Sequence, residues 1–141
     1  MQVVILGCGR VGARLASVLD AEAHHVTVID KNQLSFQYLD EKFKGKMVVG
    51  TGLDDQVCKE AEVNKADAFV AVTDSDNANL MAVQIAKEKF GINKSIARVY
   101  DPKRAAAFRE LGITTVSPTI MMTDLLKEAL FPRTTVIGKK K

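Results

Sequence analysis

Cysteine is scarce in this sequence, which has only Cys8 and Cys58 among its 141 residues. The two cysteines lie far apart, and neither belongs to a Cys-x-x-Cys motif or lies near a pair of histidines. A disulfide framework needs more cysteines, and a zinc site needs ligands at short, regular spacing. The sequence therefore favours a reducing compartment such as the cytosol, and we expect no metal site.

Long hydrophobic runs are missing as well. The first apolar stretch, residues 3–6, is soon interrupted by Gly7 and Arg10, and no basic segment precedes it. A membrane-spanning helix needs about 20 predominantly apolar residues, and a signal peptide begins with a basic segment. We therefore expect neither a signal peptide nor direct insertion into a membrane.

A marked excess of one charge is also absent. The chain has 20 Lys and Arg against 17 Asp and Glu, and the last three residues, 139–141, are all lysine. The body of the chain is thus balanced, which argues against a strongly cationic nucleic-acid-binding fold and predicts no nucleic-acid partner. A chain of this length can bury one core, but it is too short for a dinucleotide-binding domain plus a full substrate domain.

Short apolar runs alternate with helical patterns along the whole chain. The runs predict six strands, at residues 3–6, 26–29, 47–49, 68–72, 95–99 and 113–116. Apolar residues at helical spacing predict helices between them, at about residues 11–20, 34–43, 53–61, 75–90 and 102–111, with a last helix from Pro118 to about residue 130. Strands joined by helices predict an α/β fold with a Rossmann-like, doubly wound, six-stranded parallel sheet and helices on both faces.

The first strand runs into a GxGxxG motif made by Gly7, Gly9 and Gly12, and Asp30 closes the next strand. A lone GxGxxG is weak evidence, but a strand before it, a helix after it and an acid at the end of the next strand make it specific. Gly7 permits the tight turn, Gly9 lets phosphate approach, and Gly12 lets helix and strand pack closely. The motif favours an adenine-nucleotide site over a purely structural loop.

Phosphate is expected at the start of the first helix, where free N–H groups carry a partial positive charge. Arg10 lies in this loop and either reaches the phosphate or faces solvent, and Cys8 is expected to fill space in the loop. Asp30 can accept hydrogen bonds from ribose hydroxyls, and its carboxylate repels a 2′-phosphate. The sequence therefore disfavours NADP.

Further motifs extend beyond this loop: ILGCGRVG at residues 5–12, VID at 28–30, VVGTGLDD at 48–55, FVAVT at 69–73, Thr73-x-x-Asp76-x-x-Asn79, IARV at 96–99, Leu111-Gly112-Ile113 and Ser117-Pro118. From residue 1 to about residue 132, the chain resembles the RCK/KTN (TrkA-N) family of cytosolic regulators of potassium channels and transporters. Many relatives have Gly-Asp where this chain has Gly50-Thr51, and a threonine cannot supply the carboxylate.

The resemblance implies a binding site for NAD(H), with ATP, ADP or AMP as alternatives. It places Gly7, Cys8, Gly9, Arg10, Val11 and Gly12 around the phosphates and Asp30 and Lys31 at the ribose. Thr51, Gly52 and Leu53 would flank the adenine, while Thr73, Asn79 and Arg98 would lie at the central crevice. The same polar residues also suit simpler roles, since Thr73, Asp76 and Asn79 can serve a helix start and Arg98 can form a salt bridge.

The resemblance also implies the kind of assembly. Residues 1–133 would form the nucleotide-binding domain with a C-terminal dimerisation helix, followed by a tail or the start of a linker at 134–141. The domain would form a homodimer or a larger ring and would gate a membrane potassium transporter or channel subunit from the cytoplasm, peripheral to the inner face of the membrane.

Two other functions compete with this one. A small NAD-dependent oxidoreductase needs an acid–base group beside the nicotinamide, and the sequence offers no Tyr-x-x-x-Lys pair and no His–Asp arrangement near the predicted strand ends. An interaction module that has lost its ligand would not need an intact glycine loop with Asp30. We therefore predict a regulatory domain and not an enzyme.

Overall fold

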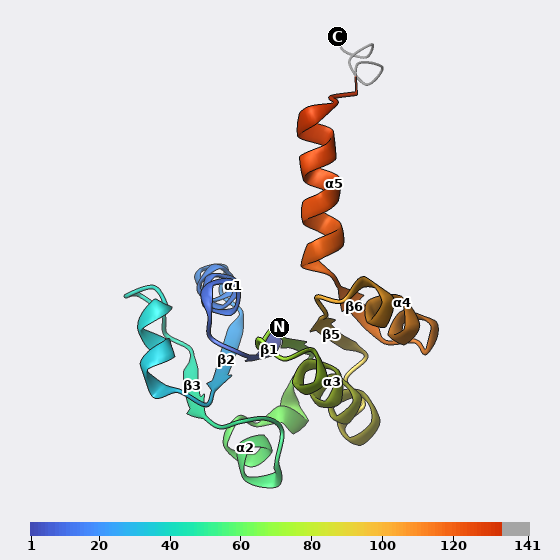
Figure 1. Cartoon of the computed structure of the whole chain (residues 1–141). Coiled ribbons are helices and arrows are strands. Elements are labelled where there is room, and N and C mark those ends of the chain that lie inside the picture. Colours follow the sequence, from blue (N-terminus) through green and yellow to red (C-terminus); the bar gives the residue numbers. More distant parts are fainter. Residues whose placement is uncertain (134–141) are drawn as a thin grey trace.

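The computed structural model describes residues 1–133 and shows a single sheet with helices around it (Figure 1). The described residues form six strands: β1 (Gln2–Leu6), β2 (His25–Asp30), β3 (Lys46–Val49), β4 (Ala68–Ala71), β5 (Lys94–Arg98) and β6 (Thr114–Val116). Every neighbouring pair is parallel, and the strand order is β3-β2-β1-β4-β5-β6. This confirms the predicted Rossmann-like fold. The predicted tail, residues 134–141, lies outside the described residues.

Helices connect the strands, and most begin and end where polar residues and glycine predict it. They are α1 (Arg10–Ala21), α2 (Asp55–Glu60), α3 (Asp76–Phe90), α4 (Pro102–Glu110) and α5 (Pro118–Leu130), with short 3-10 helices η1 (Gln33–Tyr38) and η2 (Val63–Lys65). The Ser75 hydroxyl caps α3, and Gly91 ends it in the left-handed conformation that glycine adopts without strain.

The helix predicted at residues 34–43 is wrong, because only the 3-10 helix η1 forms there. Asn32 caps η1 by accepting from the Leu34 N–H, and Leu39 already has an extended backbone. The backbone N–H of Asp40 then donates to the Ser17 hydroxyl of α1, at 3.0 Å, in place of a helical carbonyl. Contact with α1 thus ends the helix early, although the apolar spacing of the segment fits a longer one.

Two hydrophobic clusters cover the two faces of the sheet. One packs α2, α3 and α4 against one face, where Phe69 and Val83 are fully buried. The other packs α1 and the η1 segment against the opposite face, around Ile5 and Val28. Successive residues of a strand point to opposite faces, so the continuous apolar run of β1 serves both clusters.

Helix α5 differs from the other α-helices because none of its residues is buried. It extends away from the sheet and the remaining helices (Figure 1). Large apolar side chains of α5 and the residue that follows it are exposed: Met121, Met122, Leu125, Leu126, Leu130 and Phe131. None of the helices within residues 1–133 is long and apolar enough to cross a membrane.

Candidate functional site

The glycine loop after β1 has the geometry that its three glycines predict. Gly7 has a φ of +109°, and a Cβ there would lie 2.8 Å from the Val72 backbone. Gly12 packs against the loop itself, since a Cβ at this position would lie 1.8 Å from the Gly7 carbonyl oxygen. Gly9 is different: apart from its two chain neighbours, a Cβ there would meet no described residue within 4 Å. The loop is therefore tight at Gly7 and Gly12 and open at Gly9.

The N-terminus of α1 is left available for an anion. Side chains accept hydrogen bonds from first-turn N–H groups at the starts of α2, α3 and α4. Within residues 1–133, no side chain does so for α1, whose N-cap is Gly9 and whose first turn carries Arg10 in place of an acid. A helix normally favours acidic residues at this end, so a free first turn with a cation suits a bound phosphate.

Asp30, at the end of β2, lies directly beside this loop. One carboxylate oxygen accepts from the Cys8 N–H at 2.7 Å, and the other accepts from the Asn32 N–H at 2.8 Å. These two bonds fix the orientation of the carboxylate. Each carboxylate oxygen has more than one acceptor site, so Asp30 can still accept from ribose hydroxyls.

Cys8 is a buried part of the loop. Its thiol donates to the Ser35 carbonyl at 3.4 Å, and burial, followed by the negative charge of Asp30, raises the pKa of the thiol to about 11. A thiol with this pKa stays protonated at neutral pH and is a poor nucleophile. The position of Cys8 agrees with its expected role as a space-filling residue.

A cavity of about 790 Å³ opens over the loop, between the carboxyl ends of β1, β2, β4 and β5. Ligands of open α/β sheets bind in this crevice, where the strand order reverses. The cavity is lined by nine of the predicted site residues: Gly7, Gly9, Arg10, Val11, Asp30, Lys31, Thr51, Thr73 and Arg98. The structure therefore brings together residues from five separate segments of the chain.

Five predicted site residues lie outside the lining: Cys8, Gly12, Gly52, Leu53 and Asn79. Cys8 is buried within the loop, and Gly12 packs against the Gly7 carbonyl. The side chain of Leu53 belongs to the core, while Gly52 precedes it in the same turn. Asn79 is fully buried beneath the crevice.

Asn79 links the ends of β4 and β5. Its side-chain oxygen accepts from the Thr73 N–H at 2.9 Å and from the Thr73 hydroxyl at 2.6 Å. Its amide nitrogen donates to the carbonyls of Thr73, at 3.0 Å, and Arg98, at 2.9 Å. Asn79 thus positions two residues of the crevice, which accounts for it without any ligand contact.

Arg98 lies at the far end of the crevice from Asp30, with its side chain only 12% exposed. One terminal nitrogen donates to the carbonyls of Val72, at 2.9 Å, and Thr73, at 3.1 Å. The guanidinium lies 5.0 Å from the ring centre of Tyr100, and its nearest carboxylate is Asp74, at 3.8 Å. Arg98 Nε has no hydrogen-bond partner among the described residues.

The cavity lining also includes residues that the sequence did not single out, among them Asp74, Ser75 and Tyr100. Tyr100 follows Arg98 by two positions at the carboxyl end of β5, the edge of the sheet where the ligand is expected. This position in the sequence was the signal from which Tyr100 could have been predicted as a site residue. The interaction with Arg98 depends on the conformation of the chain after β5, which the sequence pattern does not reveal.

A second cavity, of about 780 Å³, lies at the amino ends of the strands and is lined by His24 and His25 among others. Nδ1 of His24 lies 3.3 Å from the amino group of Met1. This end of the sheet is away from the glycine loop and Asp30, so the two histidines belong to a separate surface.

Solved structures with the same fold include TrkA-N and related domains. The TrkA-N domain of inner membrane protein ybaL from Escherichia coli matches with a TM-score of 0.80 and 22% identity, over 92% of this chain and 96% of that one. The Shewanella denitrificans Kef CTD in AMP-bound form matches with a TM-score of 0.78 and 20% identity, over 99% and 87%. At these identities the likeness supports the fold alone.

Sequence relatives are closer. The chain is 42% identical over 132 residues to the Trk system potassium uptake protein TrkA of Streptomyces coelicolor, and 38% identical over 113 residues to a TrkA homolog of Methanothermobacter thermautotrophicus. These alignments cover 94% and 80% of this chain but only 59% and 52% of the relatives. The model of the TrkA-N domain matches residues 3–118. This chain, with its glycine loop, the acid that ends β2 and its parallel sheet, therefore belongs to the TrkA-N family.

Proposed function

We propose that this chain is a nucleotide-sensing regulatory domain of a potassium uptake or channel system, which binds NAD(H) or another adenine nucleotide without transforming it. One observation carries the proposal: the uncapped N-terminus of α1 and the oriented carboxylate of Asp30 border the same cavity. The first group suits phosphate and the second suits ribose. The link to potassium comes from the relatives, which are named as Trk system potassium uptake proteins.

The proposed ligand runs across the cavity from Asp30 to Arg98. Its phosphates lie over Gly9, where no side chain intervenes, and its ribose hydroxyls bind Asp30. The adenine lies on the side of Thr51, and the remaining part of the ligand extends toward Thr73 and Arg98. The carboxylate of Asp30 disfavours a 2′-phosphate, so NADP is expected to bind more weakly than NAD.

NAD(H) is the first choice among adenine nucleotides. The cavity continues past the glycine loop to Arg98 and Tyr100, which leaves space for the second half of a dinucleotide. AMP, ADP and ATP are the alternatives, and a structural neighbour is described in an AMP-bound form. All of these ligands share the adenosine and phosphate that the Asp30 end of the site recognises.

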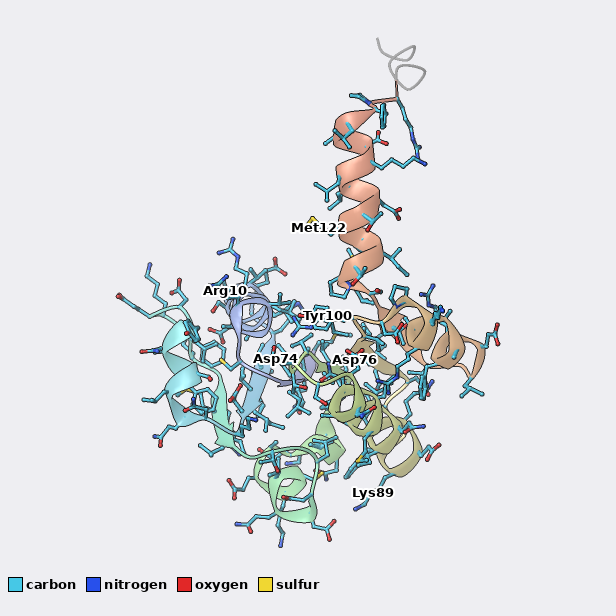
Figure 2. The ribbon with its side chains drawn as sticks, viewed as in Figure 1. Arg10, Asp74, Asp76, Lys89, Tyr100 and Met122 are labelled. Carbon is cyan, nitrogen blue, oxygen red and sulfur yellow. The ribbon has the colours of Figure 1, made fainter. Side chains whose placement is uncertain are left out.

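Regulation requires a second element that responds to the ligand. We assign this role to α5, whose exposed apolar side chains fit a second copy of the chain (Figure 2, Met122). A ligand can shift the arrangement of two subunits only if it binds one arrangement more tightly than the other. In this proposal the dimer, or a larger ring, acts on a membrane potassium transporter subunit from the cytoplasmic side.

A thermal-shift panel tests the proposal. We expect NADH, NAD, ATP, ADP or AMP to raise the unfolding temperature, because a ligand at one hundred times its Kd stabilises the folded state by about 2.7 kcal/mol. NADP should give the smaller shift when compared with NAD at equal concentration. If none of the adenine nucleotides shifts the transition, the proposed site is wrong. Sustained turnover of NADH with carbonyl substrates would instead indicate an oxidoreductase.

A further inference from the structure

The two ends of the cavity differ in how their acidic residues are held. At one end both carboxylate oxygens of Asp30 accept backbone N–H groups. At the other end Asp74 follows β4, with a side chain that is fully exposed. The one cation within 4 Å of its carboxylate, among the described residues, is Arg98. Asp74 therefore places an exposed negative charge beside the cation that is expected to meet the distal part of a ligand.

Arg98 is held in place independently of Asp74. Its guanidinium donates to the Val72 and Thr73 carbonyls and lies against the Tyr100 ring. The ion pair with Asp74 is long, at 3.8 Å, and one partner is in water. Such exposed pairs contribute little to stability. Removing the Asp74 carboxylate should therefore leave Arg98 where it is and change mainly the local charge.

Asp76 lies two residues further on but has a different role. Its carboxylate accepts from the N–H groups of Tyr100, at 2.9 Å, and Asp101, at 3.3 Å, which ties the start of α3 to the start of α4. Asp76 does not line the cavity, whereas Asp74 does. Figure 2 shows both residues near the start of α3, with Arg10 at the start of α1. Asp74 is thus the acid of this segment that can act on a ligand.

We propose that Asp74 determines ligand selectivity by charge: it offsets Arg98 and disfavours ligands that place several phosphate charges at this end of the cavity. The inference rests on the proposed nucleotide site and adds a selection within it. NADH, which carries little charge beyond its pyrophosphate, is favoured over ATP, whose negative charge is concentrated in the triphosphate. In this proposal, Asp74 and Arg98 together distinguish NADH from ATP by charge.

The size of the effect follows from Coulomb's law. A phosphate charge about 6 Å from the Asp74 carboxylate, in a water-like dielectric, is repelled enough to weaken binding about threefold. The penalty grows with the number of phosphate charges near Asp74 and shrinks as salt screens it. We therefore expect the Asp74→Asn substitution to tighten ATP binding more than ADP binding, and ADP binding more than AMP or NADH binding.

The experiment is a calorimetric titration of the wild-type chain and Asp74→Asn with NADH, AMP, ADP and ATP, with EDTA present so that no metal ion neutralises the phosphates. The Asp74→Asn substitution should raise the affinity for ATP at least threefold while the affinity for NADH changes less than twofold. The difference between the two ligands should diminish at high salt. The matched control is Glu88→Gln, which removes an equal charge from an exposed position of α3 and should change the affinity for neither ligand.

The two proposals fail in different ways. If the wild-type chain binds none of the four nucleotides, the nucleotide site itself is wrong. If it binds them but Asp74→Asn changes the affinities for ATP and NADH by the same factor, the nucleotide site stands and charge selection by Asp74 is overturned. The same conclusion follows if Asp74→Asn changes these affinities no more than Glu88→Gln does. Arg98→Gln is the converse variant, and it should weaken the binding of ATP more than the binding of NADH.

Discussion

The glycine loop allows packing and ligand binding to be tested separately, by the same change at two positions. A Cβ at residue 12 would lie 1.8 Å from the Gly7 carbonyl oxygen and 3.2 Å from a methyl group of Val72. The first contact involves two backbone segments, so Gly12→Ala forces α1 away from the loop. Apart from its two chain neighbours, a Cβ at residue 9 would meet no described residue within 4 Å, and Gly9 has an ordinary negative φ.

The expected magnitudes differ accordingly. Alanine improves helix propensity at position 12 by about 1 kcal/mol, but overpacking a close contact costs about 1–3 kcal/mol and more where backbone must move. We expect Gly12→Ala to lower the free energy of unfolding by at least about 2 kcal/mol. Gly9 is an N-cap, where replacing glycine by alanine costs less than about 1 kcal/mol. Its Cβ, however, occupies the proposed path of the phosphate.

Urea denaturation and NADH titration of both variants are the assays. Gly9→Ala should unfold close to the wild-type midpoint and bind NADH at least tenfold more weakly. Gly12→Ala should unfold at clearly lower urea. A Gly12→Ala chain as stable as the wild type would refute the close contact between α1 and the loop. A stable Gly9→Ala chain with unchanged NADH affinity would refute the placement of phosphate over the loop.

Three further predictions concern stability and assembly. Asn79→Ala removes four hydrogen bonds from a buried site and should lower the free energy of unfolding by about 3 kcal/mol in urea denaturation, whereas exposed Asn64→Ala should be nearly neutral. The Cys8 thiol has its pKa raised from 9.0 to about 11, so the unfolded chain loses this proton first as pH rises. Stability should then fall between pH 9 and pH 11 by up to about 2 kcal/mol, and melting curves of Cys8→Ala should show a smaller fall. If α5 joins two copies, Leu126→Lys should give folded monomers in sedimentation velocity, while Asp124→Lys on the opposite side of the helix should not; a monomeric wild-type chain at micromolar concentration would contradict the dimer.

The sequence predicts most of this fold because the central strands are short apolar runs that pack against hydrophobic clusters on both faces of the sheet. Val3 to Leu6 and Ala68 to Ala71 have this pattern, and both lie in the centre of the sheet. The segment at residues 34–43 misleads because its apolar spacing fits a helix, while its end is determined by a hydrogen bond to Ser17 of another helix. Local periodicity contains no information on such a contact.

The candidate site is predictable in the same uneven way. Gly7, Gly12 and Asp30 are recognisable because strand–loop–helix geometry restricts which residues fit there. Asn79 is recognisable as polar, but its role depends on the Thr73 and Arg98 carbonyls, which approach it only in the folded chain. Side-chain networks between distant segments of the sequence therefore require the structure.

The most direct test of the central claim is calorimetric titration of NADH into the wild-type chain and Asp30→Ala. The oriented carboxylate of Asp30 is the proposed ribose ligand, so the wild-type chain should bind and Asp30→Ala should bind at least tenfold more weakly. A melting curve measured on each sample establishes that the variant is folded, because Asp30 also orients the Cys8 and Asn32 amides. Equal NADH affinity of the two folded chains would contradict the account.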